Sequence, residues 1–136
     1  MKIASYAKKG EAFIEHCVVM VLVVIMLVIV INVFSFISLK VQLDKMSDDL
    51  LQIATYTGSF GTEFENAKQN LEDTFFDFNV TVTASEWYSQ ADKKVQLGKV
   101  MTVTVTKDTE LKGCGGFSIP MTVSSEHSGL SEKYWK

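Results

Sequence analysis

The sequence predicts an α+β protein with a long N-terminal helix, a second short helix and a small three-stranded antiparallel sheet. The long helix is predicted to be transmembrane in its first part and amphipathic in its second. Three observations support this prediction. Residues 17–39 contain no charged side chain, which is a run of 23 positions. Apolar residues then recur every three or four positions, and in the last half of the chain they recur every second position.

The apolar run is long enough to cross a membrane. As a helix it spans about 35 Å, against about 30 Å for the hydrocarbon core of a bilayer. A cleaved secretory signal fits less well, because the run is too long and no A-x-A-like site follows it. Lysines precede the run, whereas lysines and aspartates are mixed after it. This bias predicts a cytoplasmic N-terminus, a single transmembrane helix over residues 11–39 and an extracytoplasmic α+β domain over residues 40–136.

The same helix is predicted to continue beyond the membrane to about residue 57. No glycine or proline occurs between residues 11 and 57. An apolar stripe with spacings of three and four follows the run, made of Leu43, Met46, Leu50, Ile53 and Thr57. Gly58 is a natural end for a helix. We therefore expect one continuous helix of about 70 Å whose outer half presents an apolar face to the rest of the chain.

A second helix is predicted over residues 63–76. Thr62 and Glu65 form the T-x-x-E pattern of a capping box at its start. Its apolar face consists of Phe64, Ala67, Leu71 and Phe75. This face and the stripe of the long helix are the surfaces available to cover a sheet.

Three half-buried strands are predicted at residues 78–84, 95–107 and 117–124, where apolar and polar residues alternate. The middle strand is expected to place its apolar side chains on one face of the sheet; they are Val95, Leu97, Met101, Val103 and Val105. The last strand does the same with Phe117, Ile119, Met121 and Val123. The connections, residues 85–94 and 108–116, are short enough to favour an antiparallel meander. Pro120 cannot donate a ladder hydrogen bond, so the last strand is expected at an edge or with a bulge.

The composition argues against nucleic-acid binding, and the motifs indicate no catalytic or metal site. All 13 basic residues are lysines, whereas nucleic-acid-binding surfaces rely on clustered arginine. His16 and His127 have no neighbouring set of ligands for zinc and no partner for a catalytic dyad. Cys17 lies in the apolar run and Cys114 far from it, so no internal disulfide is expected. We therefore expect no enzymatic activity, no cofactor and no nucleic-acid partner.

One carboxylate, Glu15, lies at the start of the apolar run, where an unpaired charge is costly. It stands five residues after Gly10, which ends a short leader containing lysines. This order of basic leader, glycine, acid, apolar helix and β-rich outer part resembles the class III signal segment of type IV pilins and pseudopilins. It is most similar to the tight-adherence (Tad) branch, whose motif is a glycine, four residues, then glutamate and tyrosine. Here His16 stands where tyrosine is usual, and Glu11 follows the glycine where many type IV pilins have phenylalanine or methionine.

The resemblance implies one processing step and one assembly step. A membrane aspartyl peptidase, the prepilin peptidase, would cut between Gly10 and Glu11 on the cytoplasmic side and so remove residues 1–10. Glu15 would then be the family's glutamate at the fifth mature position. The new α-amine of one subunit could pair with Glu15 of a neighbour as the apolar helices bundle. A wrong stagger would leave a charge buried and unpaired, so the pair would fix the register of the subunits.

The sequence thus predicts a pilin-like structural subunit, either a pseudopilin or a minor pilin. Its expected partners are the membrane, the prepilin peptidase, an assembly platform and other pilin or pseudopilin subunits, in a homo- or hetero-oligomer. The product would be a type IV or Tad-like filament at the cell surface, or a secretion apparatus. The alternative is an uncleaved single-pass anchored protein whose outer α+β domain binds a partner, and a membrane-bound enzyme ranks last. A mature N-terminus at Glu11 would separate the first two.

Overall fold

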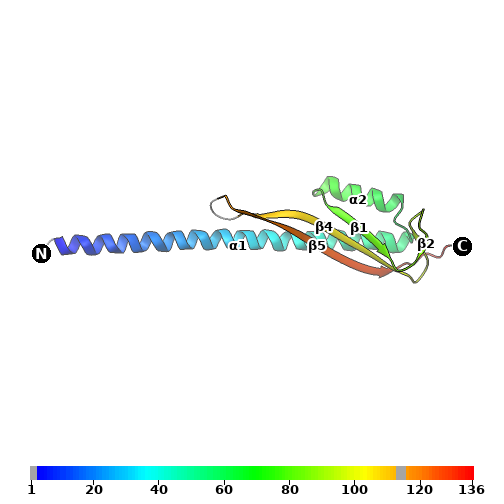
Figure 1. Ribbon diagram of the computed structural model, residues 1–136, viewed down its shortest axis with the longest axis horizontal. Coiled ribbons are helices and arrows are strands. Elements are labelled where there is room, and N and C mark those ends of the chain that lie inside the picture. The colour runs from blue at the N-terminus through cyan, green and yellow to red at the C-terminus, as the bar shows by residue number, and fades with distance from the viewer. Residues whose placement is uncertain (1–2, 113–115) are drawn as a thin grey trace.

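A computed structural model describes residues 3–112 and 116–136, with side chains from residue 13 onward within the first range. One helix, α1 (Ile3–Thr57), runs most of the length of the molecule, and the other elements gather around its C-terminal half (Figure 1). We call residues 40–136 the head. The predicted α+β class is confirmed, with a long apolar helix, a short helix and a three-stranded antiparallel sheet. Cys114 lies outside the described residues.

The long helix is confirmed, but it begins at Ile3 rather than at residue 11. Residues 3–9 include two alanines and two lysines and no proline, so they extend a helix readily. At the other end α1 stops at Thr57 as predicted, because Gly58 takes a left-handed conformation (φ 67°) and its N–H donates to the carbonyl of Ala54 at 2.8 Å.

The buried face of α1 differs from the predicted stripe in its last turns. Leu43, Met46 and Leu50 are buried as expected, whereas Ile53 and Thr57 are only half-buried. The buried side chains of the last turns also include Leu51 and Ala54. A strict three-and-four stripe missed these because both β4 and β5 pack on the helix and so cover a wider face.

The second helix, α2 (Thr62–Thr74), is confirmed, but the capping box is wrong. Gly61 is the N-cap residue, and no side chain caps the helix, because Thr62 is already its first helical residue. The helix also ends before Phe75, which is the C-cap residue and is 51% exposed rather than buried. The aromatic ring that turns toward the core is Phe76, which packs edge-on against Phe78 with ring centroids 6.5 Å apart.

The main sheet has the order β1-β4-β5, with β1 (Asn79–Ala84), β4 (Val100–Lys112) and β5 (Ser118–Leu130) all antiparallel. The expected meander is therefore confirmed. In its register Val80 faces Val105 and Val82 faces Val103. Met101, Val103 and Val105 point into the core with no exposed surface. Among the described strands β5 pairs only with β4, so Pro120 lies on an edge strand as predicted.

The middle strand was predicted to begin too early. Val95 belongs to β3 (Lys94–Val95), which pairs with β2 (Trp87–Ser89) in a separate two-stranded sheet. A turn follows in which Gly98 has a φ of 76°, and β4 starts only at Val100. Leu97, predicted to be on the buried face, is 51% exposed because it lies in this turn.

The β4–β5 hairpin is longer than predicted at both ends. Residues 108–112 were expected in a connection but continue β4, and residues 125–130 continue β5 to Leu130. Pairing runs without a break from Val100 opposite Leu130 to Lys112 opposite Ser118. Each extension has a single large apolar residue, Leu111 or Leu130, so the sequence shows no apolar alternation that would predict a strand there. The extended hairpin reaches back along α1 toward the N-terminus (Figure 1).

The core lies between α1, α2 and the sheet. The buried ring of Phe60 lies beside the C-terminal end of α1, with centroid distances of 5.2 Å to the ring of Phe64 and 5.8 Å to that of Trp87. The carbonyl of Gly58 accepts from the N–H of Val95 at 2.8 Å and from Nε1 of Trp135 at 3.2 Å. The C-terminal segment is thereby fixed to the end of α1.

Gly58→Ala is expected to lower the free energy of unfolding of the head by about 2–3 kcal/mol. The left-handed backbone penalises any Cβ, and an added Cβ would overlap the side chain of Lys133. Gly98→Ala is the matched control, because Gly98 also has a positive φ but has open space around the new Cβ. It should cost only about 1 kcal/mol. Urea unfolding of both variants in detergent checks this, and equal losses would contradict the packing argument.

Candidate functional site

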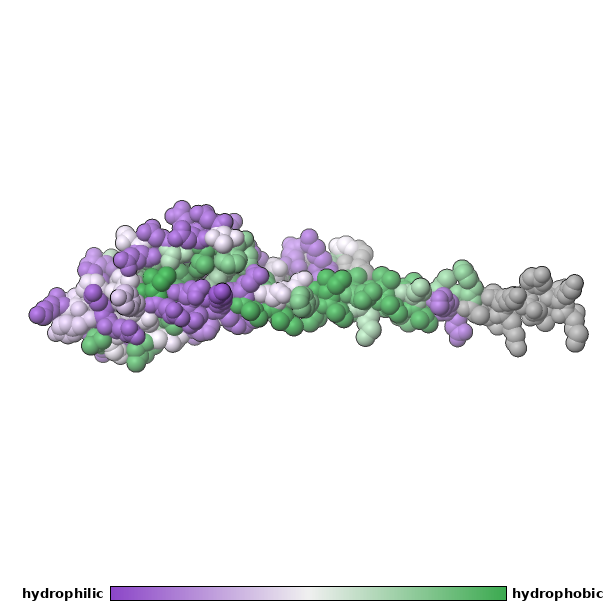
Figure 2. Space-filling view, turned by 180° about the vertical axis from the view of Figure 1, so that it is seen from behind, coloured by the Kyte–Doolittle hydropathy of each residue, from purple (hydrophilic) through white to green (hydrophobic). Residues whose placement is uncertain are grey.

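The N-terminal half of α1 is an exposed apolar surface. We call residues 13–37 the exposed apolar segment. Its large apolar side chains are 36–71% exposed, apart from the less exposed Val28. Figure 2 shows this segment as a hydrophobic band, interrupted by a hydrophilic patch near its N-terminal end, that projects from the largely hydrophilic head. An apolar surface of this extent requires lipid or a protein partner.

One helix in the described part of the chain, Phe13–Thr57, is long and apolar enough to cross a membrane. None of its most apolar stretch is buried inside the protein. It therefore differs from the core helix of a globular domain, which buries its apolar face. A single transmembrane helix over this stretch is compatible with the structure by length and composition.

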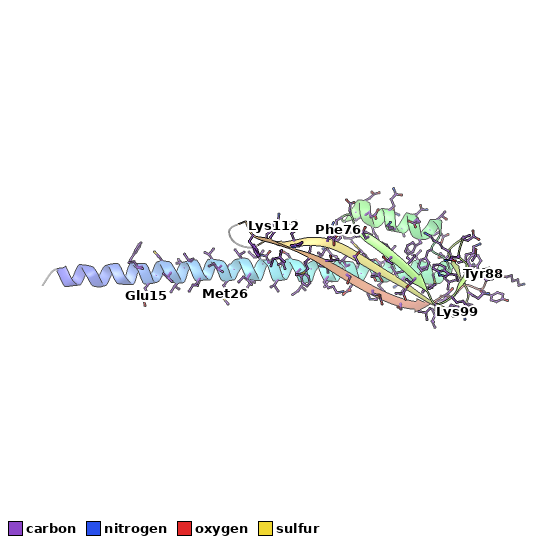
Figure 3. The ribbon with its side chains drawn as sticks, viewed as in Figure 1. Glu15, Met26, Phe76, Tyr88, Lys99 and Lys112 are labelled. Atoms are coloured by element: carbon purple, nitrogen blue, oxygen red, sulfur yellow. The ribbon has the colours of Figure 1, made fainter. Side chains whose placement is uncertain are left out.

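The predicted site residues Gly10, Glu11 and Glu15 all lie on the first part of α1. The peptide bond after Gly10 is therefore within a continuous helix. Glu15 is exposed and lies far from the head (Figure 3). From Glu15 to Asn32, which contacts Lys112 of the hairpin, is about 25 Å along the helix axis. Among the side chains that the structure describes, none forms an ion pair with Glu15.

One face of α1 next to Glu15 is hollowed. The lining side chains follow helical spacing and enclose an open depression of about 330 Å³; they are Phe13, Ile14, Cys17, Val18, Val21 and Leu22. Cys17 is an exposed free thiol in this face. A depression between side chains of one helix is the surface into which side chains of a second helix pack. The segment beside Glu15 is thus suited to helix–helix contact.

A polar network between α1 and β5 was not predicted from the sequence. Ser47 Oγ lies 2.8 Å from His127 Nδ1, and Ser125 Oγ donates to Asp44. Lys40 forms an ion pair with Asp44 at 3.2 Å. These residue types also occur in hydrolytic triads, but Ser47 has no exposed surface, so a substrate cannot reach its hydroxyl in this conformation. The network instead satisfies polar groups where the helix meets the sheet. Only the pairing register of β5 could have revealed it.

The hydrogen bond from Ser125 to Asp44, supported by Lys40 and more weakly by His127, lowers the pKa of the Asp44 carboxyl below its usual 3.8. A carboxyl with a lowered pKa in the folded state stabilises the fold above its unfolded pKa, and this contribution is lost as the pH falls through the folded pKa. Asp44→Asn should therefore cost less than about 1 kcal/mol at neutral pH, since the carboxylate is nearly half exposed.

The difference between wild type and Asp44→Asn should shrink as the pH is lowered below 3.8. Urea unfolding at neutral pH and at about one unit below that value measures it. Asp48→Asn is the control, because Asp48 is exposed on the same helix and its side chain contacts Gln52 rather than β5. A difference that is the same at both pH values would contradict the assigned role.

A second hollow of about 440 Å³ lies at the end of the head remote from the exposed apolar segment. Its lining mixes charges of both signs with two aromatic rings, those of Tyr56 and Trp135, and Lys94 Nζ lies 4.7 Å from the centroid of the Trp135 ring. Within the described residues no three His, Cys, Asp or Glu side chains gather closely enough to hold a metal ion. The hollow therefore shows a mixed polar surface without a recognisable catalytic arrangement.

The chain was compared with known proteins. Residues 17–136 match a family described as a domain of unknown function (DUF4320). This match takes in the apolar run and the whole head, so the chain belongs to that family. No curated protein and no solved structure matches it.

Proposed function

We propose that this member of the DUF4320 family is a pilin-like structural subunit, a pseudopilin or minor pilin. In this proposal the prepilin peptidase removes residues 1–10, the apolar helix holds the mature chain in the membrane with the head outside, and subunits then assemble through that helix. The product is a type IV or Tad-like filament or secretion apparatus. The subunits are either identical copies or related chains, and an assembly platform in the membrane brings them together.

One observation carries this proposal, which is the division of α1 into two halves with opposite surroundings. The C-terminal half buries Leu43, Met46 and Leu50 under its own head, whereas the N-terminal half is apolar and exposed. Burying one large apolar side chain contributes about 1.5–3 kcal/mol. A segment with this many exposed apolar side chains is stable either in lipid or in a bundle of like helices. A subunit that is first held in a membrane and then assembled into a filament requires a helix that is stable in lipid and in a helix bundle.

Glu15 adds a reason for neighbouring subunits to pack with a defined axial shift. Cleavage after Gly10 would place a free α-amine on Glu11, about 6 Å before Glu15 along the axis. The nearest cation of the head that contacts the helix, Lys112, is too far along α1 to neutralise Glu15. A neighbouring subunit shifted along the bundle could supply its amine instead. The depression around Cys17 and Val21 beside Glu15 would receive side chains of that neighbour.

Fractionation of the cells that produce the protein tests this proposal. Wild-type protein should occur both in membranes and in sedimentable material sheared from the cell surface. The alternative of an uncleaved anchored protein predicts the membrane fraction alone. Gly10→Leu is the control variant, because it should block processing and confine the protein to the membrane with its leader attached. Recovery of wild type only from membranes would contradict the proposal.

A further inference from the structure

The tip of the β4–β5 hairpin lies on the part of α1 that a bilayer would have to surround. We call residues 107–112 and 118–123 the ribbon tip, since no described third strand flanks it beyond the pairing of Thr106 with Asn79. Two hydrogen bonds mark its course along the helix. Lys40 Nζ donates to the carbonyl of Ser124 at 2.6 Å, and Asn32 Nδ2 donates to the carbonyl of Lys112 at 2.9 Å. The ribbon tip thus runs about 12 Å toward the N-terminus of α1.

The contact between ribbon tip and helix is shallow. A hollow of about 240 Å³ separates Leu111, Phe117 and Ile119 from the helix face of Ile25, Ile29 and Asn32. Phe117 and Ile119 remain 64% and 47% exposed. The Asn32 side chain also donates to the carbonyl of Val28 at 2.8 Å, so its amide keeps one partner within the helix when the ribbon tip is absent. The ribbon tip can therefore leave without creating a fully unsatisfied group.

A bilayer and the docked ribbon tip need the same segment of α1. Only residues 17–24 of the uncharged run precede the ribbon tip, and these span about 12 Å, against the roughly 30 Å of a hydrocarbon core. Moving the bilayer toward the N-terminus of α1 would place Glu15 and His16 inside its hydrocarbon core. Any position of the bilayer that spares these residues therefore places Ile25 and Ile29 within its hydrocarbon core.

The ribbon tip itself is unsuited to lipid. Asp108, Glu110 and Lys112 are exposed on the side facing away from the helix. Beyond Thr106 the outer edge of β4, like that of β5, has no strand partner among the described residues, so backbone groups there lack ladder hydrogen bonds. Both features are costly in hydrocarbon. Loss of a shallow contact costs less than insertion of three charges.

We propose that the ribbon tip and membrane lipid are mutually exclusive occupants of the α1 face formed by Ile25, Ile29 and Asn32. While the helix spans the bilayer, the ribbon tip is displaced from this face. When the segment leaves the bilayer, the ribbon tip docks and its carbonyl at Lys112 accepts from Asn32. The docked state in an assembled subunit rests on the proposed function, but the displacement by lipid does not.

Bilayer thickness provides a test that does not depend on filaments. The full-length chain, with Cys17→Ser and Cys114→Ser, carries the pair Ile29→Cys and Ile119→Cys and is reconstituted in phosphatidylcholine vesicles of short or long acyl chains. Cross-linking by a short bis-maleimide should fall on the order of tenfold from the thin to the thick bilayer, because a thin core of about 18 Å that starts at residue 17 ends at Ile29 and leaves that position within reach of the ribbon tip. The pair Lys40→Cys and Ser124→Cys is the matched control, since it lies outside the apolar run, and its yield should not change.

A fluorophore on Phe117→Cys, with brominated lipid as quencher, tests whether the ribbon tip enters the lipid. Little quenching in the thick bilayer is expected. Two results would overturn the proposal. One is cross-linking of the Ile29 and Ile119 pair that is the same in thin and thick bilayers. The other is strong quenching of the Phe117 fluorophore in the thick bilayer, which would place the ribbon tip in lipid. The same pair in material sheared from cells should cross-link as in the thin bilayer. If no such material forms, the proposed function fails while the vesicle result still decides the competition with lipid.

Discussion

Replacing Glu15 with alanine is expected to abolish assembly while insertion and processing continue. The apolar run and the residues around Gly10 are unchanged, so the membrane and the peptidase meet the same features. In the assembled bundle, however, the α-amine of the neighbouring subunit would be buried without its partner. Removing one member of a buried ion pair costs about 3–5 kcal/mol. Repeated at each subunit contact, this loss should reduce sheared filament material to background, with the protein retained in membranes.

Glu15→Gln should assemble better than Glu15→Ala but worse than wild type, because the amide keeps a hydrogen-bond acceptor and loses the charge. Asp48→Ala is the matched control, since Asp48 is an exposed acid on the head part of the same helix and should assemble normally. The measurement compares membrane-held and sheared fractions for all four proteins. Normal release of Glu15→Ala protein in sheared filaments would refute the pairing role and would leave Glu15 as a solvated headgroup-level acid.

Replacing Phe60 with alanine is expected to lower the free energy of unfolding of the head by about 3–5 kcal/mol. Phe60 is 1% exposed and its ring contacts Phe64 of α2 and Trp87 of β2, so it joins elements that follow α1 in the chain. Truncation leaves a cavity where these elements meet, and the surrounding rings cannot fill it without moving helix α2. The backbone bond from the Phe60 N–H to the carbonyl of Lys93 would survive, which limits the damage to packing.

Phe75→Ala is the matched control, because it removes the same side chain from a position that is 51% exposed. It should change the free energy of unfolding by no more than about 0.5 kcal/mol. Urea unfolding monitored by the far-UV signal of the strands measures both variants. Similar losses for the two would show that the cluster around Phe60 does not hold the head together.

The spacing of apolar residues predicted the helices and strands of this fold, because burial of one face of an element requires apolar residues at the period of that element. Leu43, Met46 and Leu50 are buried on one helix face, and Val103 and Val105 are buried on one sheet face, at the expected spacings. The extension of the hairpin to Lys112 was missed because Leu111 is its only apolar residue, and because it packs on a helix expected to be surrounded by lipid. The capping box failed because Gly61 can adopt the N-cap conformation without a side-chain bond.

The candidate site was less accessible to sequence reasoning than the fold. Glu15 stood out because a charge beside an apolar run needs a partner, and that partner would come from another molecule. Asn32 gave no signal beyond being polar in an apolar run, and its contact with Lys112 depends on a separation of 80 residues. The Ser47–His127 contact likewise joins residues 80 apart, through the register of β5. Contacts of this kind depend on tertiary structure and leave no local pattern.

The mature N-terminus of the native protein tests the central claim most directly. Intact-mass and N-terminal peptide analysis of protein sheared from the cell surface should show a chain that begins at Glu11, with residues 1–10 absent. Processing at this bond is what creates the amine that Glu15 is proposed to pair with. A surface-borne or membrane-held population that retains Met1 to Gly10 throughout would contradict the account and favour an uncleaved membrane-anchored protein.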